Sequence, residues 1–232
     1  MKKPKKTFLP LFYKKNPRRP LSKKQKKLLK FTLQKFLFKK KNIKSNKKFL
    51  EIGFGYGENL IHLSKNNTKK IIIGCEVYEP GIANLVKNIE VENLENIYIY
   101  PKNIFTLFDR LEKDSIEKIF ILYPDPWPKK KHFKRRLISE ILLKKIHKIL
   151  KKNALIFIST DSVDYLNVIL IKFFLNKNFL WVNKKITNCY KRPKELIESK
   201  YEKKAVMKGN KKYFLKFKKI SWTITFKALD CK

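Results

Sequence analysis

Short apolar segments alternate along the chain with segments whose apolar residues recur every three or four positions. Segments of the first kind predict buried strands, and segments of the second kind predict amphipathic helices. The predicted strands cover residues 48–53, 70–76, 97–100, 118–123, 154–159, 179–186 and 213–217. The predicted helices are 58–66, a helix opened by Pro80, a short helix from Ile104, a stripe from Leu137 to Ile149, and a stripe from Val163 to Phe174.

Strands that alternate with helices predict an α/β fold, in which helices cover both faces of a mostly parallel sheet. Apolar residues at every second position of Ile220–Phe226 predict one further strand, whose place in the sheet is not readable. In open sheets of this class, ligands bind at the carboxyl ends of the strands. The loops that follow the first five strands are therefore the candidates for function.

The beginning of the chain differs in composition from the rest. Residues 1–20 are rich in Lys, Arg and Pro and predict a mobile basic arm. Ser22 and Gln25 form the pattern of a capping box, which opens a predicted helix that ends near residue 38. We therefore expect a helix and a polar linker over 21–47, followed by one domain over 48–232.

The first predicted strand ends in a turn with three alternating glycines, Gly53, Gly55 and Gly57. Glycines let a backbone approach a ligand where a Cβ would collide with it. The second predicted strand ends at Glu76, whose carboxylate can accept hydrogen bonds from both ribose hydroxyls of an adenosine. The turn and this acid together predict a site for an adenosine-containing cofactor.

The glycine spacing favours one class of cofactor. Dinucleotide enzymes prefer G-x-G-x-x-G, but here the last position is Glu58, a carboxylate that would oppose a pyrophosphate at a helix N-terminus. With Leu50 and Glu51 before it, the turn resembles motif I of the Rossmann-like methyltransferases, which bind S-adenosylmethionine, a ligand without phosphate. A dehydrogenase and a chance glycine loop are the alternatives for the turn alone.

The loop after the fourth predicted strand carries a more specific motif. Pro124-Asp125-Pro126-Trp127, followed by the basic run Lys129–Arg136, resembles the bacterial tRNA (guanine-N7-)-methyltransferase family. The resemblance covers roughly residues 49–217 and extends to Leu50–Gly55, Gly74–Val77 with Pro80-Gly81, Thr160-Asp161, Arg192-Pro193, and Ser199–Glu202 with Lys204-Ala205. It implies a Rossmann-like seven-stranded methyltransferase fold that uses S-adenosylmethionine as cofactor. It also implies a tRNA (guanine(46)-N7)-methyltransferase activity on the variable loop of tRNA.

The residues of this loop suit that chemistry. Guanine N7 is an unprotonated ring nitrogen on the major-groove edge, so it can attack a sulfonium methyl without a strong base. Methylation leaves a positive charge on the base, which a nearby carboxylate would stabilise. Two prolines fix the backbone around Asp125, so we expect Asp125 to be the catalytic residue. The alternative is that Asp125 only caps a turn.

The resemblance implies further roles by position. The implied cofactor-binding residues are Glu51, Gly53, Gly55, Gly57, Glu76, Asn103 and Asp125. The implied substrate-binding residues are Lys129, Asp161, Ser199, Lys200, Tyr201 and Glu202. Asn103 stands where the family usually has an acid that contacts the adenine, and Ser199 stands where it usually has Thr. Asp161 or Glu202 would select guanine by accepting from N1–H and N2–H, and Trp127 either stacks on a base or packs under its loop.

Composition supports a nucleic-acid partner without deciding it. The chain has 57 basic and 19 acidic residues and a net charge of +38, a field that attracts polyphosphates. The abundance of Lys, Asn and Ile also fits a bias in the nucleotide composition of a genome. The chain has three cysteines and three histidines, and their spacing predicts neither a disulfide framework nor a metal site. No apolar stretch approaches the roughly 20 residues of a membrane span. We expect the protein to be a cytoplasmic monomer.

Two other functions compete with this one. Another Rossmann-like methyltransferase could act on an adenine or on a glutamine amide. Such enzymes typically have two consecutive prolines in this loop, whereas here Trp127 follows Pro126 directly. A basic RNA-binding protein without a cofactor is the second alternative. The intact glycine turn, together with Glu51 and Glu76, argues against it, whereas Asn103 favours it.

Overall fold

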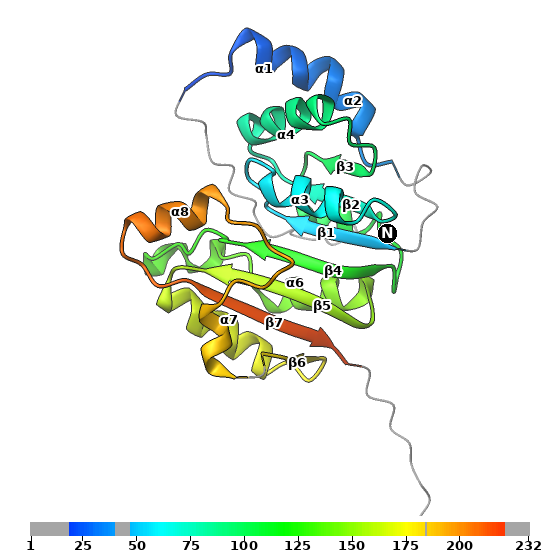
Figure 1. Cartoon of the computed structure of the whole chain (residues 1–232). Coiled ribbons are helices and arrows are strands. Elements are labelled where there is room, and N and C mark those ends of the chain that lie inside the picture. The colour runs from blue at the N-terminus through cyan, green and yellow to red at the C-terminus, as the bar shows by residue number, and fades with distance from the viewer. Residues whose placement is uncertain (1–18, 40–46, 184, 221–232) are drawn as a thin grey trace, which may run out of the picture.

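The computed structural model describes residues 19–39, 47–183 and 185–220, and Figure 1 shows their arrangement. The strands of the described residues are β1 Lys48–Ile52, β2 Ile71–Cys75, β3 Ile97–Tyr100, β4 Ile116–Leu122, β5 Leu150–Thr160, β6 Phe179–Trp181 and β7 Tyr213–Lys219. They form one seven-stranded sheet in the order β3-β2-β1-β4-β5-β7-β6. The first five strands are parallel, and β7 is antiparallel to both β5 and β6.

Helices cover both faces of this sheet, as the alternation of strands and helices predicted. The helices after β1 are α3 Glu58–Asn66, α4 Glu79–Val91, α5 Ile104–Phe108, α6 Glu140–Ile149, α7 Val163–Phe174 and α8 Lys200–Met207. Two 3-10 helices, η3 Lys130–Arg135 and η4 Ile186–Tyr190, interrupt the longer loops. The observed bounds of α3 agree with the predicted ones. The predicted Rossmann-like methyltransferase fold is confirmed.

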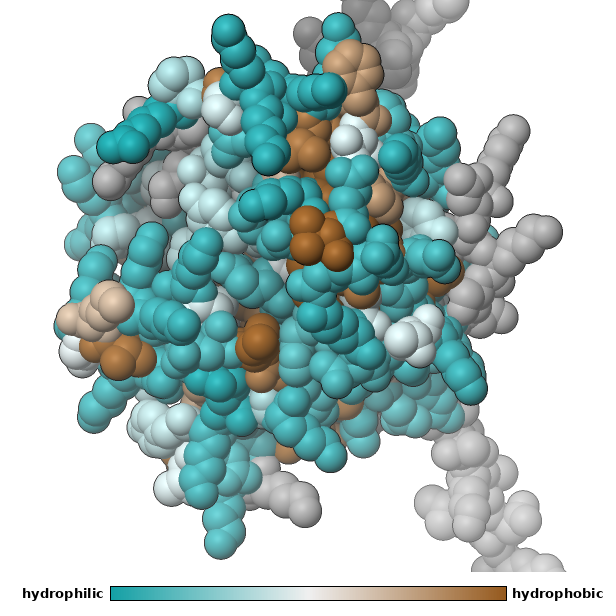
Figure 2. Space-filling view, turned by 45° about the horizontal axis from the view of Figure 1, so that its top comes forward, coloured by the Kyte–Doolittle hydropathy of each residue, from teal (hydrophilic) through white to brown (hydrophobic). Residues whose placement is uncertain are grey.

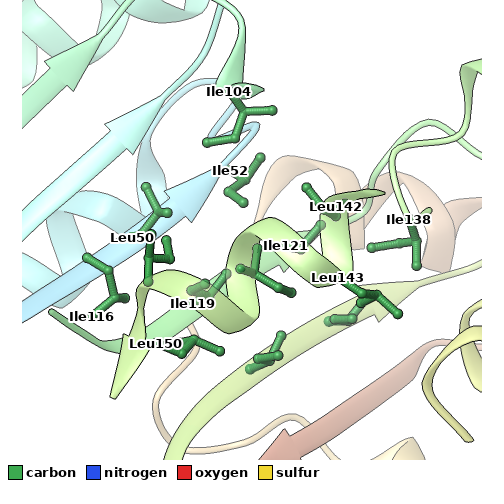
Figure 3. Packing of buried hydrophobic residues seen from close by; sticks show 14 of the residues in the cluster. Leu50, Ile52, Ile104, Ile116, Ile119, Ile121, Ile138, Leu142, Leu143 and Leu150 are labelled. Carbon is green, nitrogen blue, oxygen red and sulfur yellow. The ribbon is translucent and has the colours of Figure 1, made fainter. Parts of the chain in front are cut away.

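The core has two halves, one on each face of the sheet. Because side chains alternate along a strand, Leu50 and Ile52 of β1 pack toward α5 and α6, whereas Phe49 packs toward α3 and α4. Figure 3 shows Ile119 and Ile121 of β4 beneath α6, in the first of these halves. Alternating strand residues are fully buried on both sides, which explains the continuous apolar runs in the sequence.

The predicted N-terminal helix is present but not uniform. It consists of α1 Lys23–Lys27, a π-helical turn η1 Leu28–Thr32, and α2 Leu33–Phe36. The capping box is confirmed, because Gln25 N donates to Ser22 Oγ and Ser22 N donates to Gln25 Oε1. The helix packs beside α4, and Leu37 pairs with Ile99 at the outer edge of β3. It therefore covers the edge of the sheet nearest the second and third strands.

Several predicted elements differ from the observed bounds by a few residues, and two of these differences have a clear local cause. The strand predicted to reach residue 186 ends at Trp181, because the side chain of Asn183 bonds Lys216 N and Phe214 O in place of a backbone partner. The helical stripe predicted from Leu137 begins only at Glu140, after Ser139 caps the helix. Both predictions of the boundary were wrong. The further strand predicted for Ile220–Phe226 lies outside the described residues, apart from Ile220.

Candidate active site

A cavity of about 890 Å³ opens at the carboxyl ends of the parallel strands. Its lining includes Gly53 after β1, Glu76 after β2, Asn103 after β3 and Asp125 after β4. The structure thus brings together one expected residue from each of four successive loops. Ligands bind in this position in open α/β sheets. Glu51 of β1 and Gly55 and Gly57 of the glycine turn are buried and lie outside that lining.

Glu76 joins the two turns that form the cofactor end of the cavity. Gly55 N donates to Glu76 Oε2 at 2.9 Å, while Val77 N and Tyr78 N donate to Oε1 at 2.7 and 3.0 Å. A carboxylate offers about four lone-pair sites, so Glu76 still has a site that can accept from a ribose hydroxyl. Gly55 has a φ of +58°, a left-handed conformation that favours glycine.

The residues around the cavity fit S-adenosylmethionine. A Cβ added at Gly53 would meet no atom within 4 Å, and Gly53 lines the cavity, so a side chain there would occupy ligand space. Asn103 caps α5, because its Oδ1 accepts from Phe105 N at 2.9 Å. Its amide nitrogen is then the part suited to donate to adenine N1. This geometry therefore leaves Asn103 a hydrogen-bond donor for the adenine, whose contact with Asn103 the resemblance implied.

Glu51 is a buried acid beneath this region, with only 2% of its surface exposed. Its Oε2 accepts from Asn59 Nδ2 at 3.0 Å. Burial is the main cause that raises the pKa of Glu51 to about 8, and the charges of Glu58 and Glu76 add to it, while the bond from Asn59 opposes it. Glu51 is therefore largely protonated at neutral pH when no cation is near. Its contact with the cofactor stays a prediction.

The loop that carries Asp125 is held from below by an arginine. Arg136 Nε donates to Pro126 O at 2.7 Å, and the guanidinium lies 3.9 Å from the centre of the Phe133 ring. Arg136 is only 8% exposed. Although Arg136 belongs to the basic run Lys129–Arg136, its side chain is not solvated, because its guanidinium holds the loop in place. Asp125 itself is exposed at the cavity.

The rest of the basic run forms η3 at the rim of the cavity. Lys134 and Arg135 line the cavity, whereas Lys129 is exposed just before the helix. Trp127 packs against this helix, with the Arg135 guanidinium 5.0 Å and the His132 ring 5.6 Å from its ring. Of the two roles left open for Trp127, the contacts favour packing within the loop.

The expected substrate residues near α8 have different surroundings. Ser199 caps the helix by accepting from Glu202 N, and Glu202 is 1% exposed in an ion pair with Arg192 and Lys212. Lys200 and Asp161 lie nearby: Lys200 Nζ stands 4.5 Å from the centre of the Tyr56 ring, and Asp161 accepts from Asn210 at 3.0 Å. Of these expected substrate residues, Tyr201 lines the cavity.

Sequence reasoning missed several residues of the lining. Arg19, Ser22 and Gln25, from the start of the N-terminal helix, contribute to the cavity wall, and so do Lys102 and Lys204. The capping box predicted the helix but not its place beside the active site. Only a long-range contact decides that place, and the local pattern carries no signal for it.

Comparison with known proteins gives the family. A family model described as a putative methyltransferase matches residues 45–215. The tRNA (guanine-N(7)-)-methyltransferase of Ruegeria pomeroyi is 35% identical over 172 residues, which cover 74% of this chain and 72% of that protein. The chain belongs to the tRNA (guanine-N7-)-methyltransferase family. The cofactor of this family is S-adenosylmethionine, as the resemblance implied.

Two further comparisons show how much of a longer relative this chain covers and which fold it shares with a solved structure. The bifunctional methyltransferase of Rickettsia prowazekii is 35% identical over 189 residues, and the match covers 80% of this chain but only 36% of that relative's length. A solved SAM-dependent O-methyltransferase from Thermotoga maritima superposes with a TM-score of 0.51 at 15% identity, covering 87% of this chain and 72% of that one. This structural likeness supports the methyltransferase fold alone.

Two classes of feature are absent from the described ranges. None of the helices there combines the length and the apolar character needed to cross a membrane. The same residues contain no group of three or more His, Cys, Asp and Glu side chains placed to hold a metal ion.

Proposed function

We propose that this chain transfers the methyl group of S-adenosylmethionine to N7 of a guanine in tRNA, and that the target is guanosine 46 of the variable loop. Family membership supports the activity. The observation that carries it is that Asp125 opens into the same cavity as Gly53 and Glu76, so the proposed catalytic acid and the cofactor turn share one space.

The chain's own residues have a limited chemical task. When bound, S-adenosylmethionine supplies an electrophilic methyl group, which the lone pair of guanine N7 can take without prior loss of a proton. Asp125 is proposed to stabilise the positive charge that develops on the base, by charge and hydrogen bonding rather than as a general base. The anchor from Arg136 to Pro126 keeps this carboxylate oriented toward the base, since catalysis here depends mainly on alignment.

Basic side chains surround the cavity and suit an RNA backbone. Basic residues in the lining come from four separate segments and include Arg19, Lys102, Lys134, Arg135 and Lys204. The acids in the lining are Glu76 and Asp125. Phosphate contacts of this kind fix the register of a nucleic acid and carry no sequence information. The face in Figure 2 is largely hydrophilic, with small, separate apolar patches.

Recognition of the base is proposed to involve Lys129, Asp161, Ser199, Lys200 and Glu202. The carboxylates of Asp161 and Glu202 can accept hydrogen bonds from the N1–H and N2–H groups of guanine. Adenine offers neither donor, because its N1 carries no hydrogen and its C2 carries no amino group. Glu202 is paired with Arg192, so a contact to guanine requires the base to replace part of that ion pair. We further propose that the enzyme acts on tRNA in the cytoplasm as a monomer.

Incubation with labelled S-adenosylmethionine and tRNA, followed by borohydride and aniline cleavage, tests the proposal. Label should enter tRNA, and cleavage should map to a guanosine of the variable loop. Asp125→Asn should lower kcat by about a hundredfold with little change in tRNA affinity. Asp164→Asn, at an exposed acid in the first turn of α7, is the matched control and should retain activity. Absence of label from tRNA, or equal losses of turnover and affinity in Asp125→Asn, contradicts the proposal.

A further inference from the structure

Tyr201, the second residue of α8, lies against the glycine turn. A Cβ added at Gly55 would come within 2.9 Å of Tyr201 Cε2 and 3.4 Å of its hydroxyl oxygen. The ring also lines the cavity, and 38% of the residue is exposed. Figure 1 shows α8 beyond the arrowheads of β1 and β4, on the side where the cavity opens. The helix therefore supplies an aromatic wall to the cofactor end of the site.

The surroundings of the ring locate it more closely. Burial, followed by the charges of Glu76 and Asp125, raises the pKa of Tyr201 to about 12, so both carboxylates lie near the hydroxyl. Glu76 is the acid for the ribose, and Asp125 is the acid beside the methyl acceptor. In S-adenosylmethionine the positive sulfur is bonded to both the ribose carbon and the methyl group. The ring thus lies against Gly55 and near both acids that, in the proposed function, flank the sulfonium.

We propose that Tyr201 is a cofactor-binding residue, which holds the positive sulfonium against its aromatic ring. Family resemblance implied a contact with the RNA substrate instead. The proposal rests on the proposed function to the extent that the cavity is an S-adenosylmethionine site. Aromatic rings attract cations within about 6 Å of their centre. The spent product, S-adenosylhomocysteine, carries no charge on sulfur, so the ring favours the methyl donor over the product and assists product release.

Other rings of the cavity are less suited to this role. Lys200 Nζ lies 4.5 Å from the centre of the Tyr56 ring, so an ammonium group already lies over the aromatic ring of Tyr56. Tyr78 packs edge-on against Tyr56, with ring centres 6.0 Å apart. Lys204 Nζ is 5.8 Å from the centre of the Tyr201 ring, near the outer limit for a useful attraction. Of the rings of Tyr56, Tyr78 and Tyr201, that of Tyr201 is therefore the best placed for an additional cation.

Calorimetric titration of the full chain with S-adenosylmethionine and with S-adenosylhomocysteine, in the absence of RNA, tests this role. Tyr201→Leu should weaken binding of the charged methyl donor roughly 3- to 30-fold more than binding of the neutral product. Tyr201→Phe keeps the ring and should keep the wild-type ratio of the two affinities. Tyr56→Leu, at the ring already facing Lys200, should leave that ratio unchanged. Circular dichroism establishes folding, and Tyr201→Met replaces Tyr201→Leu should the latter not fold.

Several outcomes overturn the proposal. Equal losses for both ligands in Tyr201→Leu show that the ring only packs, and no loss for either shows that it makes no contact. A changed ratio in Tyr201→Phe assigns the effect to the hydroxyl rather than to the ring. Because RNA is absent, the result is separable from the proposed function. A protein that binds both ligands with the expected ratio but leaves tRNA unlabelled contradicts only the RNA activity.

Discussion

The anchor between Arg136 and the Asp125 loop leads to a quantitative prediction. Arg136→Met keeps an unbranched side chain of similar length against Phe133 but removes the donor to Pro126 O. The second contact, from Arg136 to Trp127 O, is 3.5 Å long and therefore contributes little to the free energy that holds the loop. A hydrogen bond from a charged donor contributes about 1.5–3 kcal/mol. If that free energy keeps the loop in its productive position, kcat should fall roughly 10- to 150-fold.

Steady-state methylation of tRNA measures this effect. The KM for tRNA should change little in Arg136→Met, since Arg136 is only 8% exposed and its Nε bonds to Pro126 O. Lys134→Met is the matched variant, because Lys134 is an exposed member of the same run at the cavity rim. It should raise the KM for tRNA while kcat stays near the wild-type value. A rise in KM with unchanged kcat in Arg136→Met would refute the anchoring role.

Three further predictions concern pH, backbone conformation and salt. The pKa of Glu51 is about 8 in the folded chain and about 4.3 when unfolded, so its contribution to stability is complete below pH 4 and is lost toward pH 8. The melting temperature of the cofactor-free protein should therefore fall relative to Glu51→Gln across this range, and parallel curves would contradict the assignment. Gly55→Ala should lower the free energy of unfolding, measured by urea titration, by about 1 kcal/mol or more beyond the effect of Gly209→Ala. Both glycines have positive φ, but only at Gly55 does the added Cβ meet another residue, Tyr201, so equal costs would argue against that contact. Affinity for tRNA should fall steeply with salt, and Lys134→Met should reduce the slope of log Kd against log salt by about 0.7–0.9; an unchanged slope would exclude a phosphate contact there.

Local patterns predicted the parts of the fold that local interactions determine. The glycine turn, the acid after β2 and the limits of α3 follow from residues adjacent in sequence, and the structure has them where the sequence indicated. The end of β6 was mispredicted because Asn183 substitutes its side-chain amide for a backbone partner of β7. That substitution depends on a strand about thirty residues away, which no local pattern identifies.

The candidate site was predicted less completely for the same reason. Charged residues such as Arg136 and Glu202 normally lie at the surface, so a sequence with many lysines suggests solvated side chains for both. Their burial depends on specific partners, Pro126 O for the guanidinium and Arg192 for the carboxylate. The place of Tyr201 against Gly55 joins two distant segments of the chain. Contacts of this kind follow from tertiary packing rather than from residue order.

The position of β7 between β5 and β6 has a consequence for biosynthesis. Because β7 is the last strand of the described chain and enters the sheet between two earlier ones, the hydrogen-bonding edge of β5 stays open until residue 219 has left the ribosome. Until β7 has emerged, the nascent protein therefore exposes an unprotected strand edge, a known template for aggregation.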